Sequence, residues 1–288
     1  MKTLRECIAE ARAKKVAIGH FNFSNLEGLY AIARAAKTLG VPVIVGLSEG
    51  EQEAVGIHQA VALVRTIREH WGIDIYLNAD HHYSFVTVKE AIDAGFDSVI
   101  YDGASHSYEE NVTISKQCVD YARQVSAQTG RDIIVEVELG YIGEGSKMRD
   151  TIPEGVAVTT SPDEAKKFIA ETGADMLAPA VGNFHGMLKV GSKPRLDINC
   201  IAGITRALPD TPLVLHGGSG EDADFDAAIE AGIAIVHVNT ELRRAYTQAL
   251  RDYMTNHPED IAPYKYAANA ALAMEAVATD KLRKFNRL

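Results

Sequence analysis

The stretch AIDAGFDSVI, residues 91–100, runs from the end of an amphipathic helix through a glycine into an apolar strand. The same order of features returns in FIAETGADML (168–177) and in AIEAGIAIVHV (228–238). Each glycine suits the left-handed conformation that commonly ends a helix. The repetition therefore predicts a fold assembled from one repeated βα unit.

Short apolar segments rich in β-branched residues alternate with longer helical patterns along the whole chain of 288 residues. Eight such segments are expected to form strands: KVAIGHFN (15–22), PVIVGLS (42–48), DIYLNADHH (74–82), SVIYDG (98–103), DIIVEVELG (132–140), MLAPAVGNFHG (176–186), PLVLHGGSG (212–220) and IAIVHVNTEL (233–242). This order and number favour a closed (β/α)8 barrel, the TIM barrel, over an open doubly wound sheet. We expect one domain over residues 1–288.

Composition and charge argue against two classes of partner. The net charge is −10 and no basic stripe is present, which argues against sequence-independent binding of nucleic acid. No apolar run approaches membrane-spanning length, so no membrane partner is expected, and residues 1–15 form a charged amphipathic pattern rather than a signal peptide. Cys7, Cys118 and Cys200 lie far apart without a CxxC motif, which predicts reduced thiols and a cytoplasmic protein.

Polar residues end most of the predicted strands. In a barrel of parallel strands the carboxyl ends face one mouth, where the chemistry of such barrels takes place. His82 should point away from His81, because side chains alternate along a strand. The residues at this mouth are Asn22, Ser48, Asp80, His81, His82, Asp102, Glu138, His185, His216, Asn239 and Thr240.

Three of these residues are histidines from three different strands: His81, His185 and His216. A single histidine at a strand end is more often a solvated bystander than a ligand. Three neutral imidazoles around one point, with a fourth position open, form a typical catalytic zinc site. The pattern therefore favours a bound Zn²⁺.

A glycine-rich turn, GGSG (217–220), directly follows His216. Its backbone N–H groups can bind a phosphate group, and phosphate sites after the last two strands are common in these barrels. The other interpretation is a tight turn without a ligand. Two long irregular stretches, 141–160 and 186–197, are expected to act as lids over the mouth.

Several motifs together resemble the class II, zinc-dependent ketose-bisphosphate aldolases: NADHH (78–82), YDG (101–103), EVELG (136–140), VGNFHG (181–186), LHGGSG (215–220) and NTEL (239–242). Residues 21–51 and 110–122 extend the resemblance over nearly the whole chain. It implies the reversible cleavage of a phosphorylated ketose, such as fructose 1,6-bisphosphate or tagatose 1,6-bisphosphate, to dihydroxyacetone phosphate and an aldehyde. Zinc on the three histidines would replace the Schiff-base lysine of the other aldolase class.

The resemblance also implies roles for single residues. Asp80 matches the acid that exchanges a proton with the hydroxyl on carbon 4 of the substrate. Asp102 and Glu138 match residues near the metal that can bind a second or displaced ion. The positions expected to contact the substrate or its phosphate are Asn22, Ser48, Gly186, Lys189, Gly217, Gly218, Ser219, His237, Asn239 and Thr240.

Four departures from the family pattern affect the substrate. His237 stands where the family generally carries an asparagine, and Ala271 stands where it carries a phosphate-binding arginine. Glu144 is the nearest candidate for the base that removes the proton from carbon 3, with Asp150 more distant. Phe184 replaces a small residue and is expected to narrow the pocket.

Because of these departures, a second phosphate would need another group, such as Lys189 or Arg243, or the substrate carries one phosphate. Two other functions stay open: a metal-dependent sugar-phosphate epimerase or isomerase, and a non-catalytic relative that binds a phosphosugar. A homodimer or homotetramer is expected from the resemblance. The apolar C-terminal helix can cover either a neighbouring subunit or its own barrel.

Overall fold

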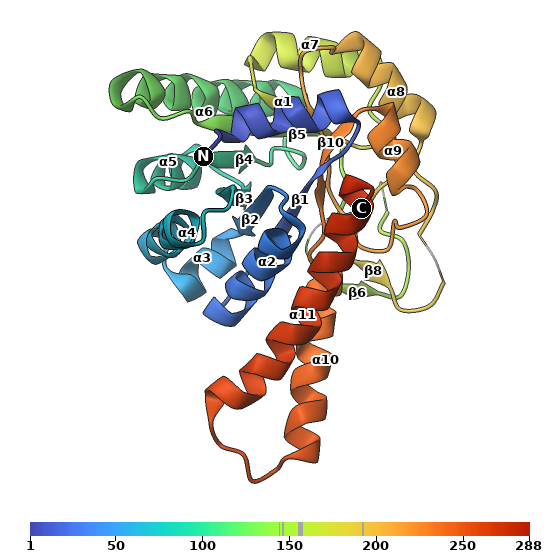
Figure 1. Ribbon diagram of the computed structural model, residues 1–288. Helices are drawn as coiled ribbons and strands as arrows, with labels where there is room; N and C mark the ends of the chain where they lie inside the picture. The colour runs from blue at the N-terminus through green and yellow to red at the C-terminus, as the bar shows by residue number, and fades with distance from the viewer. Residues whose placement is uncertain (144, 146, 155–157, 192) are drawn as a thin grey trace.

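Eight parallel strands close into a barrel in the computed structural model, which describes residues 1–143, 145, 147–154, 158–191 and 193–288 (Figure 1). Around the barrel the order is β1-β10-β9-β7-β5-β4-β3-β2. Each strand lies within one of the eight predicted segments, and the predicted (β/α)8 barrel is confirmed. The strands are β1 (Ile18–Asn22), β2 (Val43–Leu47), β3 (Ile75–His82), β4 (Ser98–Tyr101), β5 (Ile134–Leu139), β7 (Met176–Pro179), β9 (Leu213–Leu215) and β10 (Ile233–His237).

Helices cover the outside of the barrel, as the repeated βα unit predicts. Gly95 and Gly173, two of the three repeat glycines, cap helices in the left-handed conformation. The helices in the described part of the chain are α1 (Leu4–Lys14), α2 (Leu26–Leu39), α3 (Glu49–Val55), α4 (Ile57–Trp71), α5 (Phe85–Ala94), α6 (Tyr108–Thr129), α7 (Pro162–Thr172), α8 (Ile198–Ala207), α9 (Phe225–Ala231), α10 (Thr240–Asn256) and α11 (Pro263–Asn286).

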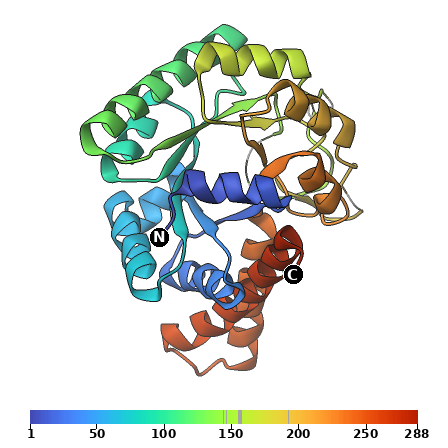
Figure 2. The ribbon, with the colours of Figure 1, turned by 45° about the horizontal axis from the view of Figure 1, so that its top comes forward.

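Helix α1 precedes the barrel and lies across its amino-terminal end (Figure 2). Leu4 and Ile8 of this helix are buried in one apolar cluster with strand residues such as Ile18, Tyr76 and Ile134. Burial of these side chains removes apolar surface from water and closes this end of the barrel. The carboxyl ends of the strands form the other, open end.

The two stretches predicted as lids meet above that open end. Their strands β6 (Met148–Arg149) and β8 (Met187–Leu188) form a separate parallel pair. The amide of Met187 also donates a hydrogen bond to the carbonyl of Lys147, at 3.0 Å. The pairing holds both stretches next to the site described below.

Helices α10 and α11 form an antiparallel pair that projects beyond the barrel (Figure 1). Leu282 and Phe285, near the end of α11, are fully buried in the main core, so this part of the helix covers its own barrel. Ile261, Tyr264 and Leu272, nearer the projecting end, are exposed. No helix among the described residues is both long and apolar enough to span a membrane.

Candidate active site

The carboxyl ends of the strands surround a cavity of about 230 Å³. Most of the residues predicted at this mouth contribute to its wall, although they come from strands that are far apart in the sequence. The cavity is lined by Asn22, Ser48, Asp80, His81, Tyr83, Gly145, His185, Gly186, Gly217, His237, Asn239, Thr240 and Arg243.

The end of β3 departs from regular strand geometry. In a regular strand Asp80 and His81 would point to opposite faces, yet both line the cavity. The pairing with β4 shifts in register between Ala79 and His82, and His81 has a left-handed backbone with φ of 48°. Such a conformation costs a non-glycine residue about 1–2 kcal/mol. The strained backbone therefore places an acid and an imidazole side by side in the site.

His82 does not line the cavity and is fully buried. Its Nε2 accepts a hydrogen bond from Gln52 of α3 at 2.9 Å. This contact fixes the end of β3 against the neighbouring helix, so His82 has a structural role beside the site.

The three predicted ligands His81, His185 and His216 come together. Their ring centroids lie 4.6 Å (His81–His185), 4.8 Å (His81–His216) and 5.9 Å (His185–His216) apart. Nδ1 of His185 lies 2.7 Å from the carbonyl oxygen of Gly143, which can only accept a hydrogen bond. Nδ1 must therefore carry the proton, and Nε2 keeps its lone pair for a metal.

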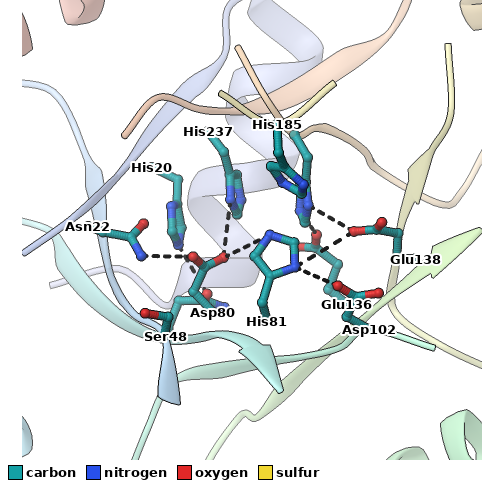
Figure 3. A network of polar contacts seen from close by, with 12 residues as sticks. His20, Asn22, Ser48, Asp80, His81, Asp102, Glu136, Glu138, His185 and His237 are labelled. Atoms are coloured by element: carbon teal, nitrogen blue, oxygen red, sulfur yellow. Dashed lines mark hydrogen bonds and ion pairs between the residues drawn. The ribbon is translucent and has the colours of Figure 1, made fainter. Parts of the chain in front are cut away.

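Carboxylates fix the other two rings in the same way. Nδ1 of His81 donates to Asp102 at 2.8 Å (Figure 3). Nε2 of His216 donates to Glu136 at 2.7 Å. Nε2 of His81 and Nδ1 of His216 remain for a metal. Burial lowers the pKa of both rings, but the acidic neighbours raise it, to about 9 for His81, so metal binding would release a proton from each ring. An acidic partner on the second nitrogen is the usual support of a metal-binding histidine.

Buried acceptors in this cluster have no hydrogen-bond partner among the described residues. They include Oε2 of Glu138 and Nδ1 of His216, which lie 3.1 Å apart. Burial, together with the charge of Asp102, raises the pKa of Glu138 to about 7. Orphaned acceptors of this kind are costly in a protein interior. A cation held by the three histidines would satisfy them, so the residues present fit a metal.

Asp80 lies beside the three histidines and is also buried. Its Oδ2 accepts a hydrogen bond from Nδ2 of Asn22 at 2.8 Å, and its Oδ1 lies 3.5 Å from Nδ1 of His237 (Figure 3). Burial alone would raise the pKa of Asp80, but the charge of His81 and the nearby ring of His237 hold it well below its usual range. Asp80 is thus an ionised base, and its Oδ1 has no hydrogen-bond partner among the described residues.

Glu51 of α3 anchors three residues of the cavity wall. Its Oε2 accepts hydrogen bonds from Nδ2 of Asn22 at 2.7 Å and from Oγ of Ser48 at 2.9 Å. Its Oε1 pairs with the guanidinium of Arg243 on α10. The carboxylate is buried, so this ion pair fixes one end of Arg243 while part of its side chain stays exposed.

His237 belongs to a stack of three imidazole rings. Its ring lies 3.6 Å from that of His20, nearly parallel, and 4.2 Å from that of His216. Burial lowers the pKa of both His20 and His237. The neutral His237 therefore places Nδ1 next to the carboxylate of Asp80, at 3.5 Å, and Nε2 of His20 donates a hydrogen bond to Oδ1 of Asn78 at 3.0 Å.

The predicted phosphate site lies at the amino-terminal end of α10, which begins at Thr240 with Asn239 as its N-cap. Gly217 has φ of 63°, and a Cβ there would lie 2.3 Å from the carbonyl oxygen of Phe184. Gly218 donates its N–H to the carbonyl of His237 at 2.9 Å, which ties the turn to β10. A glycine turn next to a helix amino terminus is a favourable site for an anion.

Comparison with known proteins agrees with this geometry. The family model for class II fructose-bisphosphate aldolase matches residues 2–287. The chain belongs to the class II fructose-bisphosphate aldolase family. A fructose-bisphosphate aldolase of Geobacillus stearothermophilus is 37% identical over 98% of this chain and 96% of the relative, and one from Staphylococcus aureus is 35% identical over the same shares.

Solved structures of similar proteins include the YdjI aldolase from Escherichia coli K12, with 28% identity and a TM-score of 0.82 over 99% of this chain and 97% of that one. A putative fructose-1,6-bisphosphate aldolase from Coccidioides immitis gives 29% identity and a TM-score of 0.82 over 98% and 95%. The resemblance found in the sequence is thus confirmed, and this class II aldolase is a lyase.

Some predicted residues of the aldolase lie outside the cavity wall. Lys189 pairs with Asp150 at 3.1 Å in an exposed contact of the lid stretches. The expectation that Phe184 narrows the pocket is wrong, because its ring is fully buried with Ile142 and Ala180. Ala271 is buried in the main core, and Glu144 lies outside the described residues.

Sequence reasoning missed Glu136, Glu51 and His20. Glu136 had a usable signal, because it stands two residues before Glu138 and the two must share one face of β5. His20 likewise is a polar residue inside an apolar strand segment. Glu51 resembles an ordinary helix-capping residue, and nothing in its neighbours indicates that it reaches the site.

Proposed function

We propose that this aldolase is zinc-dependent and cleaves a phosphorylated ketose to dihydroxyacetone phosphate and an aldehyde. The main support is one observation: three imidazoles from three strand ends bring ring nitrogens within 4.8 Å of one another, beside the ionised Asp80. His81, His185 and His216 would hold the metal. When bound, Zn²⁺ would act as a Lewis acid: it would polarise a ketone carbonyl and stabilise the negative charge that develops on the carbonyl oxygen.

Asp80 would take the proton of the hydroxyl on carbon 4. The bond between carbons 3 and 4 then breaks, and the aldehyde leaves. Asn22 holds Oδ2 of the carboxylate, so Oδ1 is the oxygen that receives the proton. Nδ1 of His237 lies 3.5 Å from that oxygen. General base catalysis of this kind typically contributes about 10²–10⁴-fold to the rate.

The three-carbon fragment that remains needs a proton at carbon 3. Glu144 stays the predicted donor of this proton. The fragment's phosphate group would lie in the turn formed by Gly217, Gly218 and Ser219, against Thr240 at the start of α10.

Arg243 is the better candidate for a second anionic group of the substrate. It lines the cavity, whereas Lys189 pairs with an acid of the lid stretches. Fructose and tagatose bisphosphates differ in configuration at carbon 4, where Asp80 acts, and both remain candidate substrates. The homodimer or homotetramer and the cytoplasmic location stay predictions.

A retro-aldol assay tests the proposal. The folded, zinc-loaded protein is incubated with fructose 1,6-bisphosphate, tagatose 1,6-bisphosphate and the corresponding monophosphates, and dihydroxyacetone phosphate is detected by a coupled enzyme. We expect release from at least one of them, and loss of release in Asp80→Ala. No release from any of these ketoses would overturn the proposal.

The same samples separate the alternative of an epimerase or isomerase. The position of His237 next to Asp80 gives that alternative a second group for proton transfer. Product analysis decides, because the carbon count of the sugar falls in an aldolase and stays constant in an epimerase.

A further inference from the structure

A buried ammonium group lies outside the metal site and has no role in the chemistry above. Lys193, from the second lid stretch, has a side chain that is only 2% exposed. Its Nζ donates hydrogen bonds to two backbone carbonyls, those of Phe184 at 2.6 Å and Gly217 at 2.5 Å. A lysine is almost never buried to this degree unless its charge is paired, so this placement calls for a reason.

The two carbonyls belong to the neighbours of two predicted metal ligands. Phe184 directly precedes His185, and Gly217 directly follows His216. The strands that lead to these ligands, β7 and β9, pair through Leu177 and Leu213, well before the ligands are reached. Lys193 thus links the segments that follow β7 and β9, beyond the last residues that pair in the sheet.

The surroundings of Nζ are those of a cation site. Oε1 of Glu221 lies 3.5 Å from it, with a side chain that is also only 2% exposed, and the ring of Phe184 lies 4.3 Å away. Oε1 of Glu221 has no hydrogen-bond partner among the described residues. Two carbonyl oxygens, a carboxylate and an aromatic face all favour a positive charge, which offsets the cost of burying it.

The same group supports the phosphate turn. Gly217 begins the turn that is proposed to bind the substrate's phosphate, and Lys193, which does not line the cavity, binds its carbonyl. Drawing the carbonyl toward the ammonium keeps its negative end directed away from an anion in the turn. The positive charge of Lys193 also attracts an anion bound in the turn.

We propose that Lys193 is a positioning residue, an internal cation that sets the spacing of His185 and His216 and shapes the Gly217 turn for a phosphate group. Its expected effect on zinc affinity depends only on the positions of His185 and His216. Its effect on substrate binding rests on the proposed function.

The test compares Lys193→Met with Lys116→Met, a control on the exposed face of α6. Zinc affinity is measured by competition with a chelating dye, and kcat and KM by the retro-aldol assay. Partners that orient metal ligands typically contribute about 10–100-fold to affinity. We expect zinc affinity to fall at least about tenfold and KM for the phosphorylated ketose to rise in Lys193→Met, with both unchanged in Lys116→Met.

A rescue experiment separates the lost charge from general damage. In Lys193→Ala the carbonyls of Phe184 and Gly217 lose their cation, and backbone carbonyls also bind K⁺. We expect potassium or ammonium chloride to restore part of the zinc affinity, and choline chloride, whose cation is too large, to restore none. If Lys193→Met does not fold, Lys193→Ala purified with potassium serves for the whole test.

Unchanged zinc affinity in a folded Lys193→Met or Lys193→Ala variant would overturn the inference. So would equal rescue by choline and potassium, because it would show an effect of ionic strength alone. If the wild-type protein cleaves none of the ketoses, the proposed function fails, while the zinc measurements still decide the role of Lys193.

Discussion

The contact between Glu136 and His216 yields a quantitative prediction. Oε1 of the carboxylate accepts the Nε2–H of the ring at 2.7 Å, and both side chains are at most 1% exposed. Such partners of metal-binding histidines contribute about 10–100-fold in metal affinity, and each tenfold is worth about 1.4 kcal/mol. Glutamine keeps an acceptor oxygen but loses the charge, so we expect Glu136→Gln to lose about tenfold in zinc affinity.

Alanine at this position removes the acceptor altogether. The Nε2–H of His216 then lacks a partner in the interior, and we expect a loss near the upper limit, about 100-fold or about 2.8 kcal/mol. Competition with a chelating dye measures both affinities, and circular dichroism confirms the fold. Glu90→Gln, on an exposed position of α5, is the control. Wild-type zinc affinity in a folded Glu136→Ala variant would refute the assigned role of Glu136.

Three further substitutions test the base, the phosphate turn and the second anion site. Asp80→Asn should lower kcat by about 10²–10⁴-fold with unchanged zinc affinity, and a normal kcat would exclude Asp80 as the base. Gly217 has φ of 63°, and a Cβ there would lie 2.3 Å from the carbonyl oxygen of Phe184. Gly217→Ala should therefore lower the free energy of unfolding by about 1–3 kcal/mol and raise KM. The control Gly50→Ala should change neither. Arg243→Gln should raise KM for a ketose bisphosphate but not for a monophosphate; equal effects on both would contradict that role.

The repeated local pattern explains why the barrel was predictable. The order helix, glycine, apolar strand recurs, as in 91–100 and 168–177. In each unit the spacing of apolar residues indicates a helix or a strand, and the glycine marks where the helix ends. The apolar segments show where each strand ends, and in a barrel of parallel strands these carboxyl ends lie around one mouth. His81, His185 and His216 could therefore be grouped without any knowledge of distances.

Other features of the site depend on contacts that no local pattern records. The left-handed His81 breaks the alternation that a strand predicts, and only the finished site explains why the strain is tolerated. Lys193 comes from an irregular stretch, where neither helical nor strand period indicates burial. Phe184 was misplaced for a similar reason, because its sequence position beside a ligand says nothing about which way its ring packs.

We propose that His81, His185 and His216 hold a zinc ion on which ketose cleavage depends. Metal content and release of dihydroxyacetone phosphate from fructose 1,6-bisphosphate, measured together before and after a chelator, test it most directly. We expect one zinc per chain, cleavage that disappears with the chelator, and recovery when zinc is added back. Cleavage that continues at full rate in the zinc-free protein would contradict it.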